Sequence, residues 1–166
     1  MYLEKIQSPE DVKKLDVEQL KVLAGEMRQA LIQKLSVHGG HVGPNLGMVE
    51  ATIAMHYVFD SPKDKMVFDV SHQSYCHKML TGRADEFLDE AKYDDVSGYS
   101  EPSESAHDFF CIGHTSTSVS LACGLAKARD LADENYNVIA VIGDGSLSGG
   151  EALEGLDFAK ELNGNL

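Results

Sequence analysis

The first part of the chain has a helical pattern of apolar and polar residues. Asp16 and Gln19 have the spacing of a capping box, in which two side chains bind the free backbone N–H groups at a helix start. Gly39 and Gly40 should end this helix. Between these signals, apolar residues recur at intervals of three and four and would share one face: Leu20, Leu23, Ala24, Met27, Leu31 and Leu35.

A second helix is predicted after the loop GGHVGPN, residues 39–45. Asn45 would be its N-cap and Leu46 its first residue. The sequence DSP at residues 60–62 should end it, because the residue before a proline disfavours the helical conformation. Its inward-facing residues would be Val49, Ile53 and Tyr57.

Two short apolar runs further along predict strands. They are KMVFDV, residues 65–70, and NVIAVIG, residues 137–143. Between them the sequence predicts a long surface loop from Tyr93 to Phe109, and loops of that length tend to be functional or mobile. The remaining segments predict helical pieces within SHQSYCHKMLTGR and ADEFLDEAK, and helices from about Thr115 to Ala132 and from about Leu147 to Glu161.

Helices that alternate with short apolar strands predict an α/β fold, with a mainly parallel sheet flanked by helices. The 166 residues, 43% of them apolar, are enough for one domain with a real core. A parallel sheet would continue after the last helix, so the closing LNGNL predicts a turn toward a further strand. We therefore expect a chain that is cut short of its natural end.

Composition narrows the possible partners. The formal net charge of −13 argues against nucleic acid and anionic membranes, because both need a basic face. Three cysteines without paired spacing suit a reducing compartment. The charged N-terminal stretch MYLEKIQSPEDVKKL has no apolar run fit for export or membrane spanning. Together these features predict a cytoplasmic protein.

An aspartate between two glycines follows the second predicted strand, in VIGDGSLSGG. Such a turn lies at the edge of a sheet where α/β folds bind ligands. The dinucleotide pattern GxGxxG is excluded, because position 148 is a serine. Asp144 would repel a bare phosphate, but a magnesium ion would bind both groups while Gly145 lets the backbone come close. The alternative is a glycine turn in which Asp144 caps the last helix.

Three of the seven histidines lie in loops that can converge on one sheet edge, namely His41, His72 and His114. Imidazoles suit hydrogen bonding to phosphate and proton transfer to carbonyl oxygens. A zinc site formed by His72, Cys76 and His77 is an alternative, although no further pair of ligands would complete the tetrahedron. The other histidines are predicted to be structural: His38, His56, His77 and His107.

Three motifs in order resemble a known family. They are residues 39–83, the segment GHTSTSVSLACGLAKARDL, and VIGDGSLSGGEALEGL. Together they resemble the N-terminal domain of 1-deoxy-D-xylulose-5-phosphate synthase, a transketolase-like thiamine diphosphate enzyme, from about Leu15 to Leu166. The resemblance implies a thiamine diphosphate-binding fold whose diphosphate-binding part is this chain. The pyrimidine-binding and C-terminal domains would be absent.

The resemblance also implies which residues hold the cofactor. Asp144 would bind the Mg²⁺ that bridges the diphosphate, and Gly145 and Ser146 would contact the diphosphate. The family's GHS cofactor contact matches Gly113, His114 and Thr115.

Two histidines would act on the reaction itself. His72 matches the histidine of a GHQ-type motif, although Ser71 replaces the usual glycine, and it would face the diphosphate and the reacting carbon. His41 matches a histidine that lies over the thiazolium and moves protons on substrate oxygens. The implied reaction condenses pyruvate with glyceraldehyde 3-phosphate, with loss of carbon dioxide, in a homodimeric enzyme. The product is a precursor of isoprenoids, thiamine and pyridoxal.

Several groups that the family uses would lie beyond Leu166. They are a second metal ligand, an asparagine for which Asn163 and Asn165 fall too early, the glutamate that activates the cofactor, and the groups that bind the aldehyde phosphate. We therefore expect these 166 residues alone not to turn over substrate. Two alternatives stay open: a transketolase that moves two-carbon ketol units, and a non-catalytic scaffold or half of a split enzyme.

Overall fold

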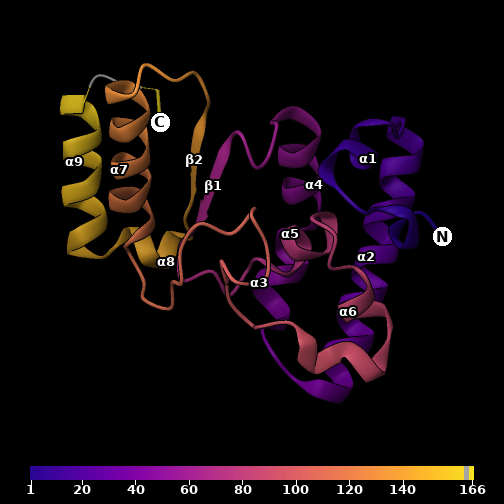
Figure 1. Ribbon diagram of the computed structural model, residues 1–166. Helices are drawn as coiled ribbons and strands as arrows, with labels where there is room; N and C mark the ends of the chain where they lie inside the picture. Colours follow the sequence, from indigo (N-terminus) through magenta and orange to yellow (C-terminus); the bar gives the residue numbers. More distant parts are fainter. Residues whose placement is uncertain (163–164) are drawn as a thin grey trace. The chain divides into compact units, whose positions relative to one another are not determined.

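The computed structural model describes residues 1–162 and 165–166, whose contacts group into two compact units (Figure 1). Unit 1 comprises Met1–Asp60 and His72–Gly98, and unit 2 comprises Ser61–Ser71 and Tyr99–Leu166. The turn predicted at LNGNL falls partly on residues 163 and 164, outside the described residues. No helix in this described part of the chain is both long enough and apolar enough to span a membrane.

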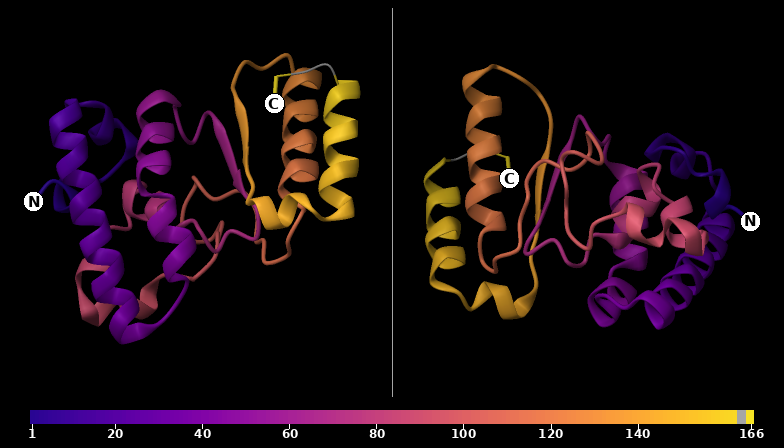
Figure 2. Two further views of the ribbon diagram at one scale, coloured as in Figure 1. Left: turned by 180° about the vertical axis from the view of Figure 1, so that it is seen from behind. Right: turned by 60° about the horizontal axis from the view of Figure 1, so that its bottom comes forward.

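Unit 1 is built from helices, and the long α2 packs against α3, α4, α5 and α6 (Figure 2). In chain order its elements are the 3₁₀ helix η1 (Leu3–Lys5), α1 (Pro9–Lys13), α2 (Val17–His38), α3 (Val42–Gly47), α4 (Val49–Val58), α5 (Tyr75–Leu80), α6 (Asp85–Leu88) and the 3₁₀ helix η2 (Glu90–Asp95).

Helix α2 forms where the sequence predicts it. The Asp16 carboxylate accepts the Gln19 backbone N–H at 2.9 Å, and the Gln19 side chain accepts the Asp16 N–H at 2.9 Å. Gly39 ends the helix with φ of 83°, a left-handed conformation that glycine adopts without strain. Apolar residues on the predicted face form the core of unit 1: Leu23, Ala24, Met27, Leu31 and Leu35, with Leu20 partly buried beside them.

The predicted start of the second helix is wrong. The chain forms the short α3, and α4 begins at Val49; Asn45 caps neither helix but is buried within α3. The inward face differs as well, since Tyr57 is 44% exposed and His56 is fully buried. The buried face of α4 is instead Val49, Thr52, Ile53 and His56, which follow the i, i+3, i+4, i+7 spacing of one helix face.

Unit 2 has the predicted α/β character. Strands β1 (Lys65–Phe68) and β2 (Val138–Val141) pair in parallel, with Lys65 opposite Val138. Helix α7 (Ser118–Leu131) lies against the strands, and α9 (Gly150–Leu162) packs on α7, after the short α8 (Asp144–Leu147) (Figure 1). The core between sheet and helices is Val67, Ile112, Ala122, Ala126 and Val138.

Two predicted helix boundaries in unit 2 are wrong. Helix α7 starts at Ser118 rather than Thr115, because Ser116 has φ of 75° and cannot belong to a right-handed helix. The predicted last helix is α9, which begins at Gly150 rather than Leu147, because Leu147 ends the separate short α8 and a tight turn at Gly149 follows it. A Cβ at Gly149 would lie 2.0 Å from Ser116 Oγ, so the two turns are in close contact.

The predicted surface loop is wrong in part. Tyr93 belongs to η2 and is buried in unit 1, while Ser100 and Asp108 are buried in unit 2. The Ser100 N–H donates to Ser71 Oγ at 2.9 Å, and the Asp108 carboxylate accepts the Glu101 N–H at 2.8 Å. These polar groups are buried because they have hydrogen-bond partners.

The turn contact generates a stability prediction. We expect Gly149→Ala to lower the free energy of unfolding by about 1–3 kcal/mol, the usual cost of an extra methyl group in a packed site. Gly150→Ala is the matched control, since a Cβ there meets nothing within 4 Å among the described residues. Urea denaturation followed by circular dichroism measures both. Equal stability of the two variants would contradict the observed packing.

Candidate functional site

Unit 1 brings two of the predicted site residues together. His41 directly precedes α3, and His72 lies three residues before α5. Their ring centroids are 5.3 Å apart and their planes differ by 75°, so one ring presents its edge to the other. Both side chains are partly exposed. Two imidazoles in contact at the surface can bind and exchange protons with a ligand.

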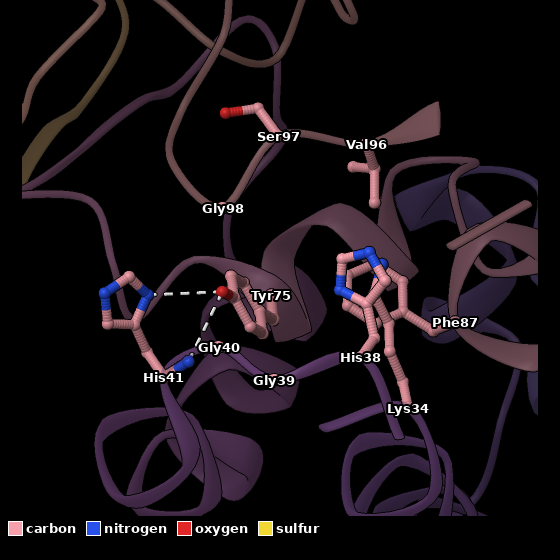
Figure 3. A pocket seen from close by; sticks show the side chains of 10 residues that line it. All are labelled: Lys34, His38, Gly39, Gly40, His41, Tyr75, Phe87, Val96, Ser97 and Gly98. Atoms are coloured by element: carbon pink, nitrogen blue, oxygen red, sulfur yellow. Dashed lines mark hydrogen bonds between the residues drawn. The ribbon is translucent and has the colours of Figure 1, made fainter. Parts of the chain in front are cut away.

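His41 also borders a pocket of about 240 Å³ (Figure 3). The Tyr75 hydroxyl lies 3.2 Å from His41 Nδ1 and accepts the His41 backbone N–H at 3.4 Å. Glycines make room for this hydroxyl, because a Cβ at Gly40 or Gly98 would lie 2.9 Å or 3.2 Å from its oxygen. Gly40 in addition has φ of 129°, which disfavours other residues.

A buried lysine lines the same pocket. Lys34 is 4% exposed, and its ammonium donates to the carbonyls of Glu86 at 3.0 Å and Tyr93 at 2.9 Å. Its Nζ also lies 4.4 Å from the centroid of the Phe87 ring. A small polar ligand in this pocket would therefore meet two imidazoles, those of His38 and His41, and the Tyr75 hydroxyl near a buried cation.

Asn45 connects these residues, and the sequence analysis missed this role. Its Nδ2 donates to the His41 carbonyl at 2.7 Å and to the His72 carbonyl at 2.8 Å. Its Oδ1 accepts the Tyr75 N–H at 2.9 Å. Two of the three partners, on His72 and Tyr75, are backbone groups 27 and 30 residues away, and no local pattern indicates them.

The glycine-aspartate-glycine turn lies in unit 2, after β2. Asp144 is exposed and is the first residue of α8, whose N-cap is Gly143. The hypothesis that Asp144 caps the last helix is therefore wrong, since α9 begins at Gly150. A Cβ added at Gly143 or Gly145 would meet no heavy atom of the described residues within 4 Å. An open turn with one carboxylate fits Mg²⁺ and a diphosphate, because the ion takes its other ligands from phosphate oxygens and water.

The segment from Gly113 to Thr115 is exposed and connected to this turn. His114 Nδ1 lies 2.8 Å from the Thr115 carbonyl oxygen. Because a carbonyl only accepts, Nδ1 carries the proton, and Nε2 is an acceptor when the ring is neutral. The next residue, Ser116, donates through Oγ to the Ser146 carbonyl at 2.7 Å. The structure thus joins the predicted cofactor contacts of unit 2.

Asp69 holds this junction in place, and sequence reasoning did not find it. The carboxylate is 1% exposed and accepts the backbone N–H groups of Ser116 at 2.9 Å and Ser118 at 3.0 Å. Burial disfavours its ionised form, but hydrogen bonds from the Ser118 backbone, the Ser146 hydroxyl and the Ser116 backbone outweigh that effect. The pKa of Asp69 is therefore lower than that of an ordinary aspartate.

The four histidines predicted to be structural have other partners. His56 Nε2 lies 3.0 Å from His77 Nδ1, and both stacked rings are buried in unit 1. His38 Nε2 lies 2.6 Å from an Asp94 carboxylate oxygen. In unit 2, His107 Nδ1 lies 2.8 Å from the Ser61 hydroxyl.

The zinc hypothesis is wrong. His77 pairs with His56, and the Cys76 thiol donates to the Asn45 carbonyl at 3.6 Å. Burial raises the pKa of Cys76 to about 12, which opposes the thiolate that zinc needs. Over residues 1–162 and 165–166, no three His, Cys, Asp or Glu side chains are grouped to hold a metal ion.

Known sequences match the whole chain. A sequence model of the family described as 1-deoxy-D-xylulose-5-phosphate synthase matches residues 3–166. The chain belongs to this family. The relative of that name from Dictyoglomus turgidum is 53% identical over 166 residues, which are 100% of this chain and 27% of the relative. The one from Caldanaerobacter subterraneus is 56% identical over 155 residues, which are 93% of this chain and 25% of the relative. This member of the family thus spans about a quarter of the length of these relatives, and the predicted resemblance is confirmed.

The lowered pKa of Asp69 generates a prediction on pH dependence. Since the folded pKa is below the unfolded value of about 3.9, its stabilisation is fully present above that pH and is lost as pH falls through the folded pKa. We expect Asp69→Asn to lower the free energy of unfolding at pH 7 by about 2 kcal/mol, because hydrogen bonds to a charged group are lost. Below about pH 4 the difference from the unmodified protein should shrink.

Urea titrations at several pH values measure this difference. Asp157→Asn, at an exposed position of α9, is the control and should leave stability nearly unchanged. A penalty for Asp69→Asn that stays constant from pH 7 to pH 3 would contradict the assigned role of the carboxylate.

Proposed function

We propose that this chain forms the diphosphate-binding part of a 1-deoxy-D-xylulose-5-phosphate synthase. The proposed reaction condenses pyruvate with glyceraldehyde 3-phosphate and releases carbon dioxide. One observation carries the proposal: an exposed Asp144 on an open glycine turn that Ser116 joins to the segment with His114. That arrangement suits a magnesium-bound diphosphate, and it belongs to a chain whose relatives have this name.

The proposed roles in unit 2 follow from the donor groups. Asp144 binds Mg²⁺ through its carboxylate, and Gly145 allows the backbone N–H groups of the turn to approach phosphate oxygens. Ser146 contacts the diphosphate, and Gly113, His114 and Thr115 contact the cofactor. Thiamine diphosphate, when bound, supplies the electron sink that decarboxylation of a 2-oxo acid requires.

The proposed roles in unit 1 concern protons. His41 holds or delivers a proton at a substrate carbonyl oxygen, since an imidazole nitrogen can both donate and accept a proton. His72, in edge contact with it, faces the diphosphate and the reacting carbon. The pocket beside His41 supports this role because it gives a small ligand access to the ring.

We further propose that the protein acts as a homodimer in the cytoplasm. The exposed apolar side chains of α9 support an association surface, with Leu153 56% and Phe158 54% exposed. The acidic composition and the free cysteines support a reducing compartment without nucleic-acid partners.

Calorimetric titration tests the cofactor assignment. We expect this chain to bind thiamine diphosphate more tightly with Mg²⁺ than without it. Asp144→Asn should weaken the magnesium-dependent binding by roughly tenfold or more, about 1.4 kcal/mol. Asp157→Asn removes an equal charge on α9 and should bind as the unmodified chain does. Magnesium-independent affinity, or equal affinity of the two variants, would contradict the role of Asp144.

A chimera tests the reaction. In it, this chain replaces the matching 27% of the Dictyoglomus turgidum relative. We expect carbon dioxide release from pyruvate that depends on glyceraldehyde 3-phosphate, with a product one carbon shorter than the two substrates combined. His41→Ala should lower kcat by roughly 10²–10⁴-fold, the range of general acid–base catalysis. Ketol transfer between sugars without carbon dioxide would instead favour the transketolase alternative.

A further inference from the structure

We propose that Asn45 and Tyr75 are positioning residues that hold the His41 and His72 rings in edge contact. The catalytic consequence of this positioning rests on the function proposed above. The claim that the two residues hold the rings in contact does not depend on that function. All four residues belong to unit 1. Two of them present imidazoles at the surface, and the other two are buried behind them.

The Asn45 amide fixes the two backbones that carry the imidazoles. An asparagine side chain has two N–H donors and one oxygen. In Asn45 each donor has a carbonyl partner, one on His41 and one on His72, and the oxygen accepts from Tyr75. The amide cannot be reversed, because its oxygen would then face two carbonyl oxygens. One fully buried side chain therefore connects its own segment, with His41 four residues before it, to the segment of His72 and Tyr75, 27 and 30 residues after it.

Tyr75 adds a contact to the ring itself. Its backbone is held by Asn45, and its hydroxyl contacts both the backbone N–H and Nδ1 of His41 (Figure 3). A hydroxyl that accepts the backbone N–H still has its own proton to donate to Nδ1. His41 would then carry its ring proton on Nε2. The hydroxyl has little freedom, since Gly40 and Gly98 leave just enough space for it.

A fixed ring orientation suits histidines that move protons. Catalysis by a positioned group depends on a geometry accurate to a fraction of an ångström, and the supporting shell supplies that accuracy. His41 has an exposed glycine pair before it and a short helix after it, so its own segment constrains the ring weakly. Side-chain contacts therefore hold His41: Asn45, within α3, binds its carbonyl, and Tyr75 of α5 contacts its ring.

Nuclear magnetic resonance of the histidine-labelled chain tests the geometry without any cofactor. We expect a nuclear Overhauser contact between the ring protons of His41 and His72. Asn45→Ala and Tyr75→Phe should each abolish it, and the Nδ1 signal of His41 should shift in Tyr75→Phe. The His56–His77 pair is the internal control, because its stacked rings are buried in the same unit. Tyr93→Phe is the matched variant, since it removes the hydroxyl of another buried tyrosine in unit 1.

Each outcome either supports or overturns the positioning role of Asn45 and Tyr75. Loss of the His41–His72 contact in Asn45→Ala and Tyr75→Phe, with the His56–His77 contact kept, supports positioning. Persistence of both contacts in Tyr75→Phe overturns it. Should Asn45→Ala lose both contacts because unit 1 unfolds, Tyr75→Phe decides alone. Loss of the His41–His72 contact in Tyr93→Phe would also overturn it, because the effect would not be specific.

Kinetics of the chimera separate this inference from the proposed function. If both hold, Tyr75→Phe lowers kcat by up to roughly 100-fold and shifts the pH profile, with KM less affected. Tyr93→Phe should leave kcat unchanged. A lost ring contact with unchanged kcat would refute the role of His41 and keep the positioning. A kept ring contact with reduced kcat would refute the positioning and keep the function.

Discussion

The buried carboxylate of Asp69 determines the geometry of unit 2. Asp69 lies directly after β1, and its backbone N–H donates to the Val141 carbonyl at the end of β2 at 2.7 Å. Its oxygens bind the backbone at the start of α7, where Ser116 takes a left-handed conformation. A neutral side chain would bind these N–H groups less strongly, since hydrogen bonds to a charged acceptor are about twice as strong. The strands, the helix and the open turn therefore depend on one ionised group.

Unit 1 uses a neutral side chain in the same way. Asn45 binds two carbonyls and one N–H group, whereas Asp69 binds donors alone, the N–H groups of Ser116 and Ser118 and the Ser146 hydroxyl. The difference follows from donor chemistry, because a carboxylate cannot donate to a carbonyl. In both units, one buried polar side chain fixes loops that have little regular structure of their own. Such loops carry functional groups in many folds, and a rigid support is what makes them usable.

Elements with local causes could be predicted from the sequence. Helix α2 has its capping box, its apolar face and its terminating glycine within its own segment, and the two apolar runs form β1 and β2. Elements with distant causes could not be predicted. The start of α7 depends on Asp69, 47 residues away from Ser116. Asn45 is predicted as a local cap, although two of its three partners lie 27 and 30 residues away.

The residues of the candidate site also differ in whether the sequence alone could indicate them. Motifs indicated the residues that a ligand would touch, such as Asp144 and His114, because glycine turns and loop histidines are visible in a sequence. The supporting residues Asn45, Asp69 and Tyr75 gave no such signal. Each acts through backbone atoms or one hydroxyl, and a sequence does not show which distant groups a side chain will meet.

Gly145 favours the proposed cofactor site over a scaffold of the same fold. It lies inside α8, its φ is not in the left-handed region, and a Cβ there would have open space among the described residues. Alanine would fit, and a glycine inside a helix costs roughly 0.5–1 kcal/mol relative to alanine. The fold therefore gives no reason for glycine at this position. Close approach of a ligand to the backbone does, and the adjacent Asp144 carboxylate indicates a ligand that brings a cation. A scaffold would have no use for that combination, so Gly145 supports the magnesium-diphosphate proposal independently of the histidines.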